Sequence, residues 1–198
     1  MEQKDVLKAL QRDHAAELKL AAKRLKGTAR HTEIIPSRTL SELTGHEILL
    51  KPENLQVTGS FKIRGAYNKI ASLSEEQIAR GIVTASAGNH AQGVAYAARE
   101  RHAKATICMP QITPPLKVDA TKAYGADVVL YGDVFDEAAA HAAELASTQG
   151  MIYVPPFDDY EVICGQGTIG LEILEDVPNV TDVAVSYTHL RAHETPEH

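Results

Sequence analysis

A lysine near the start of a predicted helix is the first residue in this sequence whose position suggests chemistry. The apolar run at residues 48–50 predicts a strand, and the turn residues after it lead into a helical pattern at about Ser60. Ser60 can act as the N-cap of that helix, which puts Lys62 in the first turn. The positive end of the helix dipole disfavours an ammonium group and lowers its pKa, as a nucleophilic amine requires. A solvated lysine on an exposed turn is the simpler alternative.

The residues that flank Lys62 favour the chemical interpretation. Residues 53–66 read ENLQVTGSFKIRGA and resemble the cofactor-lysine segment of the threonine/serine dehydratase family, which are pyridoxal-phosphate enzymes of fold type II. The resemblance extends from about residue 25 to residue 185. It implies that pyridoxal 5'-phosphate is the cofactor, that Lys62 is the catalytic residue and carries the cofactor as a Schiff base, and that Phe61 packs beside the cofactor.

A second segment with chemical potential lies where a predicted strand ends and a helix begins. Ligands of open α/β sheets bind at the carboxyl ends of strands, small residues allow close backbone approach, and free N–H groups at a helix start attract anions. Helix caps and a turn glycine would also explain the same residues. The segment resembles the Ser-x-Gly-Asn-His motif of the family, which implies cofactor binding by Asn89 and a loop for the substrate carboxylate. The substrate-binding residues so implied are Ser86, Ala87, Gly88, Asn89 and His90.

The roles of two residues in this loop need separate comment. His90 considered alone is more often a structural histidine than a catalytic one. Ala87 stands at the position where racemases of the family carry a serine base, so the resemblance implies elimination in preference to inversion at Cα.

The elements that must position these residues form a repeat. Apolar runs at residues 82–84, 106–109, 128–130 and 152–154 are separated by helical patterns, with a period of roughly 22 to 24 residues. This alternation predicts an α/β fold with a parallel sheet and helices on both faces. Helical patterns fall within residues 5–26 and 166–174, and a further short strand is expected at 180–185.

The resemblance also divides the chain into lobes. It implies the fold of tryptophan synthase β-like enzymes, in which residues 75–154 form a small α/β lobe. Residues 1–74 and 155–185 would then belong to a larger, truncated lobe. Residues 186–198 lack the glycine-rich phosphate loop expected there and resemble a non-native tail. The three histidines of this tail leave a metal site open as an alternative, but without regular ligand spacing we expect no metal.

The letters GQGTIG at residues 165–170 match the dinucleotide-binding pattern G-x-G-x-x-G. The residues before them do not read as a buried strand, so we expect the start of a helix near the cleft in place of a dinucleotide site.

Composition narrows the function classes. The chain has 198 residues, 44% of them hydrophobic, and a net charge of −6, with no basic run and no long apolar stretch. Neither nucleic acid nor a membrane is therefore expected as a partner. No signal peptide is recognisable, and Cys108 and Cys164 form no metal-ligand pair, which favours the cytoplasm.

The resemblance thus implies a threonine ammonia-lyase that converts L-threonine to 2-oxobutyrate, or L-serine to pyruvate, with release of ammonia. It implies a small amino acid as substrate, a homo-oligomer for the complete protein, and a role in amino-acid metabolism such as isoleucine biosynthesis. Four alternatives stay open: a serine racemase, another lyase or synthase of this fold, a nucleotide-binding module, and an inactive truncated fragment.

Overall fold

The computed structural model describes residues 13–185. The prediction of a non-native tail at residues 186–198 lies outside this part of the chain, as does the beginning of the helical pattern at residues 5–26. In chain order the elements are α2 (His14–Leu25), β1 (Ile35–Pro36), α3 (Arg38–Thr44), β2 (Leu49–Leu50), the 3₁₀ helix η1 (Glu53–Leu55), α4 (Lys62–Ala71), α5 (Glu75–Ala79), β3 (Ile82–Ala85), α6 (Asn89–Glu100), β4 (Ala105–Met109), α7 (Pro115–Lys122), β5 (Asp127–Leu130), α8 (Phe135–Gln149), β6 (Ile152–Tyr153) and α9 (Tyr160–Asp176).

The predicted parallel sheet is confirmed. Its strand order is β5-β4-β3-β6, and every neighbouring pair is parallel. The central strand β3 is buried over its whole length, as expected for a strand covered on both faces.

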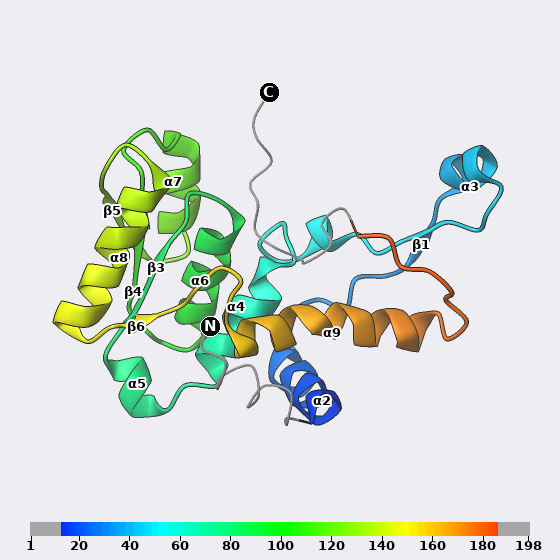
Figure 1. Ribbon diagram of the computed structural model, residues 1–198, viewed down its shortest axis with the longest axis horizontal. Helices are drawn as coiled ribbons and strands as arrows, with labels where there is room; N and C mark the ends of the chain where they lie inside the picture. Colours follow the sequence, from blue (N-terminus) through cyan, green and yellow to red (C-terminus); the bar gives the residue numbers. More distant parts are fainter. Residues whose placement is uncertain (1–12, 186–198) are drawn as a thin grey trace, which may run out of the picture.

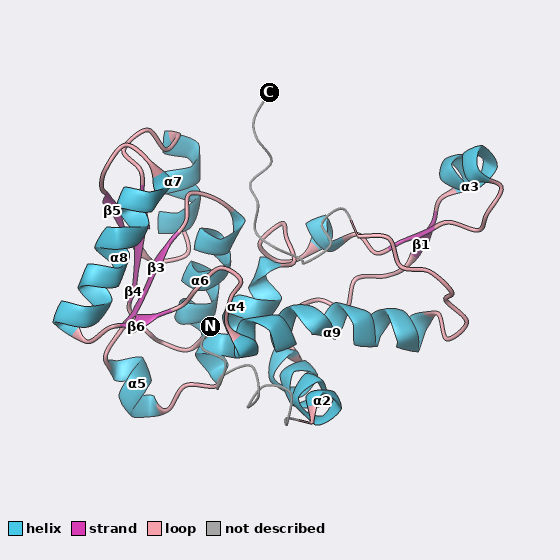
Figure 2. Ribbon diagram, viewed as in Figure 1, coloured by secondary structure: helices cyan, strands magenta, loops and turns pink. Residues whose placement is uncertain are grey.

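Helices cover both faces of this sheet (Figure 2). Side chains alternate along β4, so that Ile107 packs with α6 and α7, whereas the adjacent Cys108 packs with α8. Ala138 and Ala142 of α8 complete the second apolar cluster, and both are buried. The fold class predicted from the strand–helix repeat is therefore correct.

The rest of the described chain is less regular. Figure 1 shows the sheet with helices α5 to α8 at one end of the molecule, β1 and α3 at the other, and α4 and α9 between them. Strands β1 and β2 form a short antiparallel pair through Ile35 and Leu50. The strand expected at 180–185 is wrong, since these residues have no regular structure. A strand needs a hydrogen-bonded neighbour, and the described part of the chain supplies none at this position.

Helix α9 begins six residues before the helix start expected at Gln166. Asp159 is the N-cap, and its carboxylate accepts from the backbone N–H of Val162 at 3.1 Å. The GQGTIG letters therefore lie inside the helix and not at its start. Gly165 allows α9 to cross α4 closely, because a Cβ there would lie 2.5 Å from the Arg64 carbonyl oxygen. The match to a dinucleotide pattern thus reflects helix packing.

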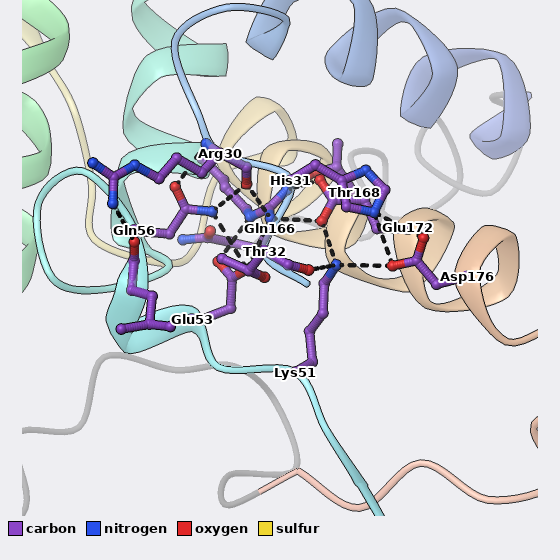
Figure 3. Close-up of polar contacts among 12 residues, drawn as sticks. Arg30, His31, Thr32, Lys51, Glu53, Gln56, Gln166, Thr168, Glu172 and Asp176 are labelled. Atoms are coloured by element: carbon purple, nitrogen blue, oxygen red, sulfur yellow. Dashed lines mark hydrogen bonds and ion pairs between the residues drawn. The ribbon is translucent and has the colours of Figure 1, made fainter. Parts of the chain in front are cut away.

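A buried ion-pair network joins α4 to α9 and η1. The Arg64 guanidinium, whose side chain is 1% exposed, donates to both carboxylate oxygens of Glu53 and to both of Glu172, at 2.6 to 2.9 Å. Burial opposes the charge, but the hydrogen bonds to the two glutamates outweigh it and raise the pKa of Arg64. Figure 3 shows the carboxylates of Glu172 and Asp176 directed at the amine of Lys51, at 2.7 and 3.4 Å. This network fixes where α4 lies relative to α9.

Candidate active site

The amine of Lys62 is buried at the first residue of α4. The residue is 3% exposed, and its Nζ donates to the backbone carbonyl of Pro156 at 2.8 Å. Burial lowers the pKa of the amine from its ordinary value of 10.5 to about 8. The lowered pKa is as expected, although its cause here is removal from water in place of the helix dipole. Lys62 is therefore a buried amine, and its lowered pKa leaves more of it uncharged near neutral pH than in an ordinary lysine. The alternative of a solvated lysine is wrong.

The residues just before Lys62 differ from expectation in one respect. Ser60 does not cap α4, because Phe61 occupies the N-cap position and no side chain bonds to the first turn. The Ser60 hydroxyl is buried without a hydrogen-bond partner in the described part of the chain, as is that of Thr58. Phe61 lies beside the amine, with its ring centre 5.2 Å from Nζ. Two hydroxyls near the lysine are thus available to a polar ligand.

The loop at residues 86–90 connects β3 to α6. The Ser86 hydroxyl accepts from the backbone N–H of Gly88 at 3.2 Å, and Gly88 is the N-cap of α6 without a side-chain cap. The first turn of α6 therefore keeps free backbone donors, which favour an anion such as a carboxylate. Asn89 is exposed, and its amide has no hydrogen bond within residues 13–185, so it is free to bind a ligand. Ala87 is partly exposed and carries no acid–base group.

His90 faces away from solvent. Its ring is buried, and Nε2 lies 3.1 Å from the Val154 carbonyl oxygen. Burial lowers the pKa of His90 to about 4, and the nearby charge of Lys62 acts in the same direction. The imidazole is therefore neutral, and only the backbone of His90 belongs to the open loop.

The two predicted segments are adjacent because α4 packs against α6. A Cβ on Gly93 of α6 would lie 3.2 Å from the backbone carbonyl carbon and oxygen of Lys62, so this glycine lets the helices approach. Sequence reasoning missed Gly93 and the Pro156 carbonyl. The two consecutive prolines after the fourth apolar run were the available signal for the latter, because prolines leave backbone carbonyls without a continuing ladder.

Comparison with known proteins places this site in a family. The model of a family described as pyridoxal-phosphate dependent enzymes matches residues 25–188. The chain belongs to this family. Its fold is the fold type II expected from the sequence, and the family's cofactor is pyridoxal phosphate.

Among curated relatives of this pyridoxal-phosphate family, the L-threonine ammonia-lyase of Thermotoga maritima is 55% identical over 169 residues, which are 85% of this chain and 42% of the relative. The catabolic L-threonine dehydratase TdcB of Staphylococcus aureus strain N315 is 53% identical over 162 residues, or 81% of this chain and 47% of the relative. The chain thus spans less than half the length of these relatives.

Solved structures of similar fold include relatives of the same kind. The processed form of threonine deaminase isoform 2 from Solanum lycopersicum has a TM-score of 0.82 and 41% identity, over 91% of this chain and 50% of that one. A serine racemase from Dictyostelium discoideum has a TM-score of 0.79 and 39% identity, over 83% and 54% of the two chains.

The residues fit the family's cofactor in part. A buried amine of lowered pKa suits a covalent bond to an aldehyde, and the free Asn89 amide and the unpaired Thr58 and Ser60 hydroxyls offer polar contacts. The glycine-rich letters at residues 165–170 lie inside α9, so they do not form a phosphate-binding loop. Among residues 13–185 there is no group of three or more metal-binding side chains and no helix that is long and apolar enough to cross a bilayer.

Proposed function

We propose that this chain is part of a pyridoxal-phosphate-dependent ammonia-lyase that eliminates ammonia from L-threonine, giving 2-oxobutyrate, and from L-serine, giving pyruvate. The buried Lys62 amine is the observation that carries the proposal. Relatives that are 52–55% identical and named for threonine deamination support it.

Lys62 is the covalent tether of the cofactor and the general base. The cofactor, when bound, supplies an electron sink that stabilises negative charge at the substrate Cα. With a pKa of about 8, about a tenth of the amine is uncharged at pH 7, on the order of 10²-fold more than for an ordinary lysine. An uncharged amine can attack an aldehyde and, once free, can accept the Cα proton.

The loop at residues 86–90 binds the substrate. Free N–H groups of the first turn of α6 suit the α-carboxylate, and the small residues Ala87 and Gly88 leave room for its approach. Asn89, whose amide is free, would hold the 3' oxygen of the cofactor. Fixing the carboxylate beside Lys62 orients the Cα–H bond toward the amine, which is the positional contribution of the protein.

The lobes follow from the same assignment. We assign residues 75–154 to a small lobe, and residues 1–74 and 155–185 to part of a larger lobe that binds the cofactor. The tail at 186–198 is assigned to neither. The complete protein would act as a homo-oligomer in the cytoplasm on a free amino acid. A catabolic role is favoured over isoleucine biosynthesis by the catabolic names of the Staphylococcus aureus relatives.

Racemisation of serine is the second candidate, because serine racemases are structural neighbours. Ala87 speaks against it, since a methyl group cannot return a proton to the opposite face of Cα. Incubation of the complete enzyme with L-serine should give pyruvate with little D-serine. D-serine as the main product would establish the racemase.

The test of the proposal is a mass map of the chain after incubation with pyridoxal phosphate and reduction with borohydride. We expect a pyridoxyl adduct on Lys62 and none in Lys62→Ala. An adduct spread over exposed lysines such as Lys104, or none at all, would overturn the assignment of Lys62.

A further inference from the structure

The carbonyl that accepts from the amine of Lys62 belongs to a segment that lies beyond the end of the β3–β6 pairing. The ladder between β3 and β6 ends where the Val154 N–H donates to the Val83 carbonyl at 2.9 Å. Pro155 and Pro156 follow and have no N–H groups, so the ladder stops there. The Pro156 carbonyl is consequently available to accept from Lys62 at 2.8 Å.

Two buried side chains contact the Val154 carbonyl, at the point where the backbone pairing ends. The Val154 carbonyl accepts from the Thr84 hydroxyl at 2.6 Å and faces Nε2 of His90 at 3.1 Å. Thr84 lies on β3 and His90 in the first turn of α6, and both are at most 2% exposed. One carbonyl oxygen therefore ties the segment after β6 to the strand and to the helix that flank the substrate loop.

The chemistry of the Val154 carbonyl fixes the tautomer of His90. A carbonyl oxygen can only accept, so Nε2 carries the proton, and Nδ1 is left as a buried acceptor without a partner in the described part of the chain. Because Nδ1 has no partner among the described residues, the contact of Nε2 with the Val154 carbonyl is the hydrogen bond that orients the ring. The neutral ring also adds no positive charge beside the amine of Lys62.

The charges near Lys62 do not explain how its amine is held. Burial alone lowers the pKa of Lys62, and His90, whose own pKa is lowered in part by the charge of Lys62, is neutral. Arg64, two residues along α4, is engaged by Glu53 and Glu172, and Asp159 in the following loop pairs with Lys69 at 2.6 Å. The described hydrogen bond that holds the amine is therefore the one to the Pro156 carbonyl.

We propose that Thr84 and His90 are positioning residues for Lys62, acting through Val154 and Pro156. They fix the segment whose carbonyl accepts one N–H of the amine, and this acceptor directs the nitrogen lone pair away from Pro156. The inference rests on the proposed function in one respect, namely that Lys62 is the reactive amine. Neither side chain needs to touch substrate or cofactor for this role.

The test uses the whole chain without cofactor. Thr84→Val removes the hydroxyl at nearly constant shape, and His90→Leu removes the Nε2 donor. Thr84→Ser and His90→Gln are the matched controls, because each keeps a donor that can reach the Val154 carbonyl. Pulse labelling with acetic anhydride at a series of pH values, resolved by mass spectrometry, gives the reactivity and the pH midpoint of Lys62, with the exposed Lys104 as internal reference.

We expect a midpoint near pH 8 in the parent chain and in both controls. In Thr84→Val and His90→Leu the released amine reaches water, so the midpoint should rise by about one unit or more, with a fall in reactivity at pH 7 on the order of tenfold. A purely structural role would lower thermal stability in Thr84→Val and His90→Leu without moving this midpoint. An unchanged midpoint in folded Thr84→Val overturns the proposal. If His90→Leu does not fold, the result for Thr84→Val is sufficient to test the proposal.

The two proposals can fail separately. If the parent chain gives no borohydride-trapped adduct on Lys62, the proposed function fails, whereas the acetylation profile still reports how the amine is held. If the adduct forms and the midpoint of Lys62 does not respond to Thr84→Val, the positioning role fails and the proposed function stands.

Discussion

Two regions of the molecule bury their interiors in different ways. The four-stranded sheet is packed with apolar side chains, and Ile82, Val83 and Ile107 are fully buried between its helices. The junction of α4 with α9 instead buries charge, with Arg64 at 1% exposure between two glutamates. Apolar contacts are non-directional, whereas a two-sided guanidinium–carboxylate arrangement tolerates little displacement. The junction that carries Lys62 is thus the part whose geometry is specified most strictly.

The largest effect should come from breaking the charged junction. Arg64→Met leaves the partly buried Glu53 and Glu172 without their main partner, and we expect a loss of about 3 kcal/mol or more in the free energy of unfolding, measured with urea. Hydrogen exchange should show the loss of protection first in α4 and α9 and later in the sheet. Equal loss of protection in both regions would mean that they do not differ in the way described.

An exposed ion pair provides the control for this substitution. Arg38 bonds to Glu42 at 2.7 Å, but the two side chains are 91% and 64% exposed. Arg38→Ala should therefore change the free energy of unfolding by less than about 0.5 kcal/mol. A cost similar to that of Arg64→Met would show that charge removal itself, and not burial, causes the effect.

The apolar region should respond to lost volume. Ile107 is fully buried on β4, a central strand of the sheet, and Ile107→Ala should cost about 3 kcal/mol through lost burial and a residual cavity. In hydrogen exchange the loss should appear in β3, β4 and β5 while α9 keeps its protection. Ile107→Val, which removes one methylene, is the matched control and should cost about 1 kcal/mol.

The sequence predicted the sheet region well and the region of α4 and α9 less well. The strand–helix repeat was readable because its apolar spacing is local, and Lys62 was placed correctly at the start of a helix. The errors concern two helix starts and one missing strand partner. Ser60 was expected to cap a helix that it does not cap, the acidic residues before α9 proved to contain its N-cap, and residues 180–185 have no neighbouring strand among the described residues. No local pattern indicates that Thr84 and His90 share the Val154 carbonyl.

The free energy of unfolding should also depend on pH through Lys62. The amine of Lys62 has a pKa of about 8 in the folded state and 10.5 in the unfolded state. Between these values the unfolded chain binds more protons, so stability rises with pH. Below about pH 8 the full cost of burying the charge is present. Lys62→Met removes that cost and leaves the Pro156 carbonyl unpaired, so at pH 7 it should be about 2 kcal/mol more stable than the parent chain.

Urea unfolding at a series of pH values checks this expectation. The advantage of Lys62→Met should shrink from pH 8 to pH 10.5, and the difference between the two chains removes the contribution of other groups that titrate there. A constant difference across this range would mean that the amine of Lys62 is not buried as a charge when it is protonated.

The smallest effect compares two glycines of α9. Gly165 meets α4, where a Cβ would lie 2.5 Å from the Arg64 carbonyl oxygen and 2.6 Å from the Gly65 Cα, whereas Gly170 has nothing within 4 Å. Both substitutions to alanine gain helix propensity of up to about 1 kcal/mol. Gly170→Ala should therefore stabilise the chain. Gly165→Ala also forces two backbones apart, at about 1–3 kcal/mol, and should be destabilising by about 1 kcal/mol net.

The sign of the difference between these glycines tests the strictness of the junction directly. If α4 and α9 could separate by a few tenths of an ångström without cost, Gly165→Ala would stabilise the chain as Gly170→Ala does. Because Arg64 binds Glu172 of α9 through two hydrogen bonds, such a movement should lengthen both of them. Combining Gly165→Ala with Arg64→Met should then cost less than the sum of the two single substitutions, since the contacts that resist separation are already gone.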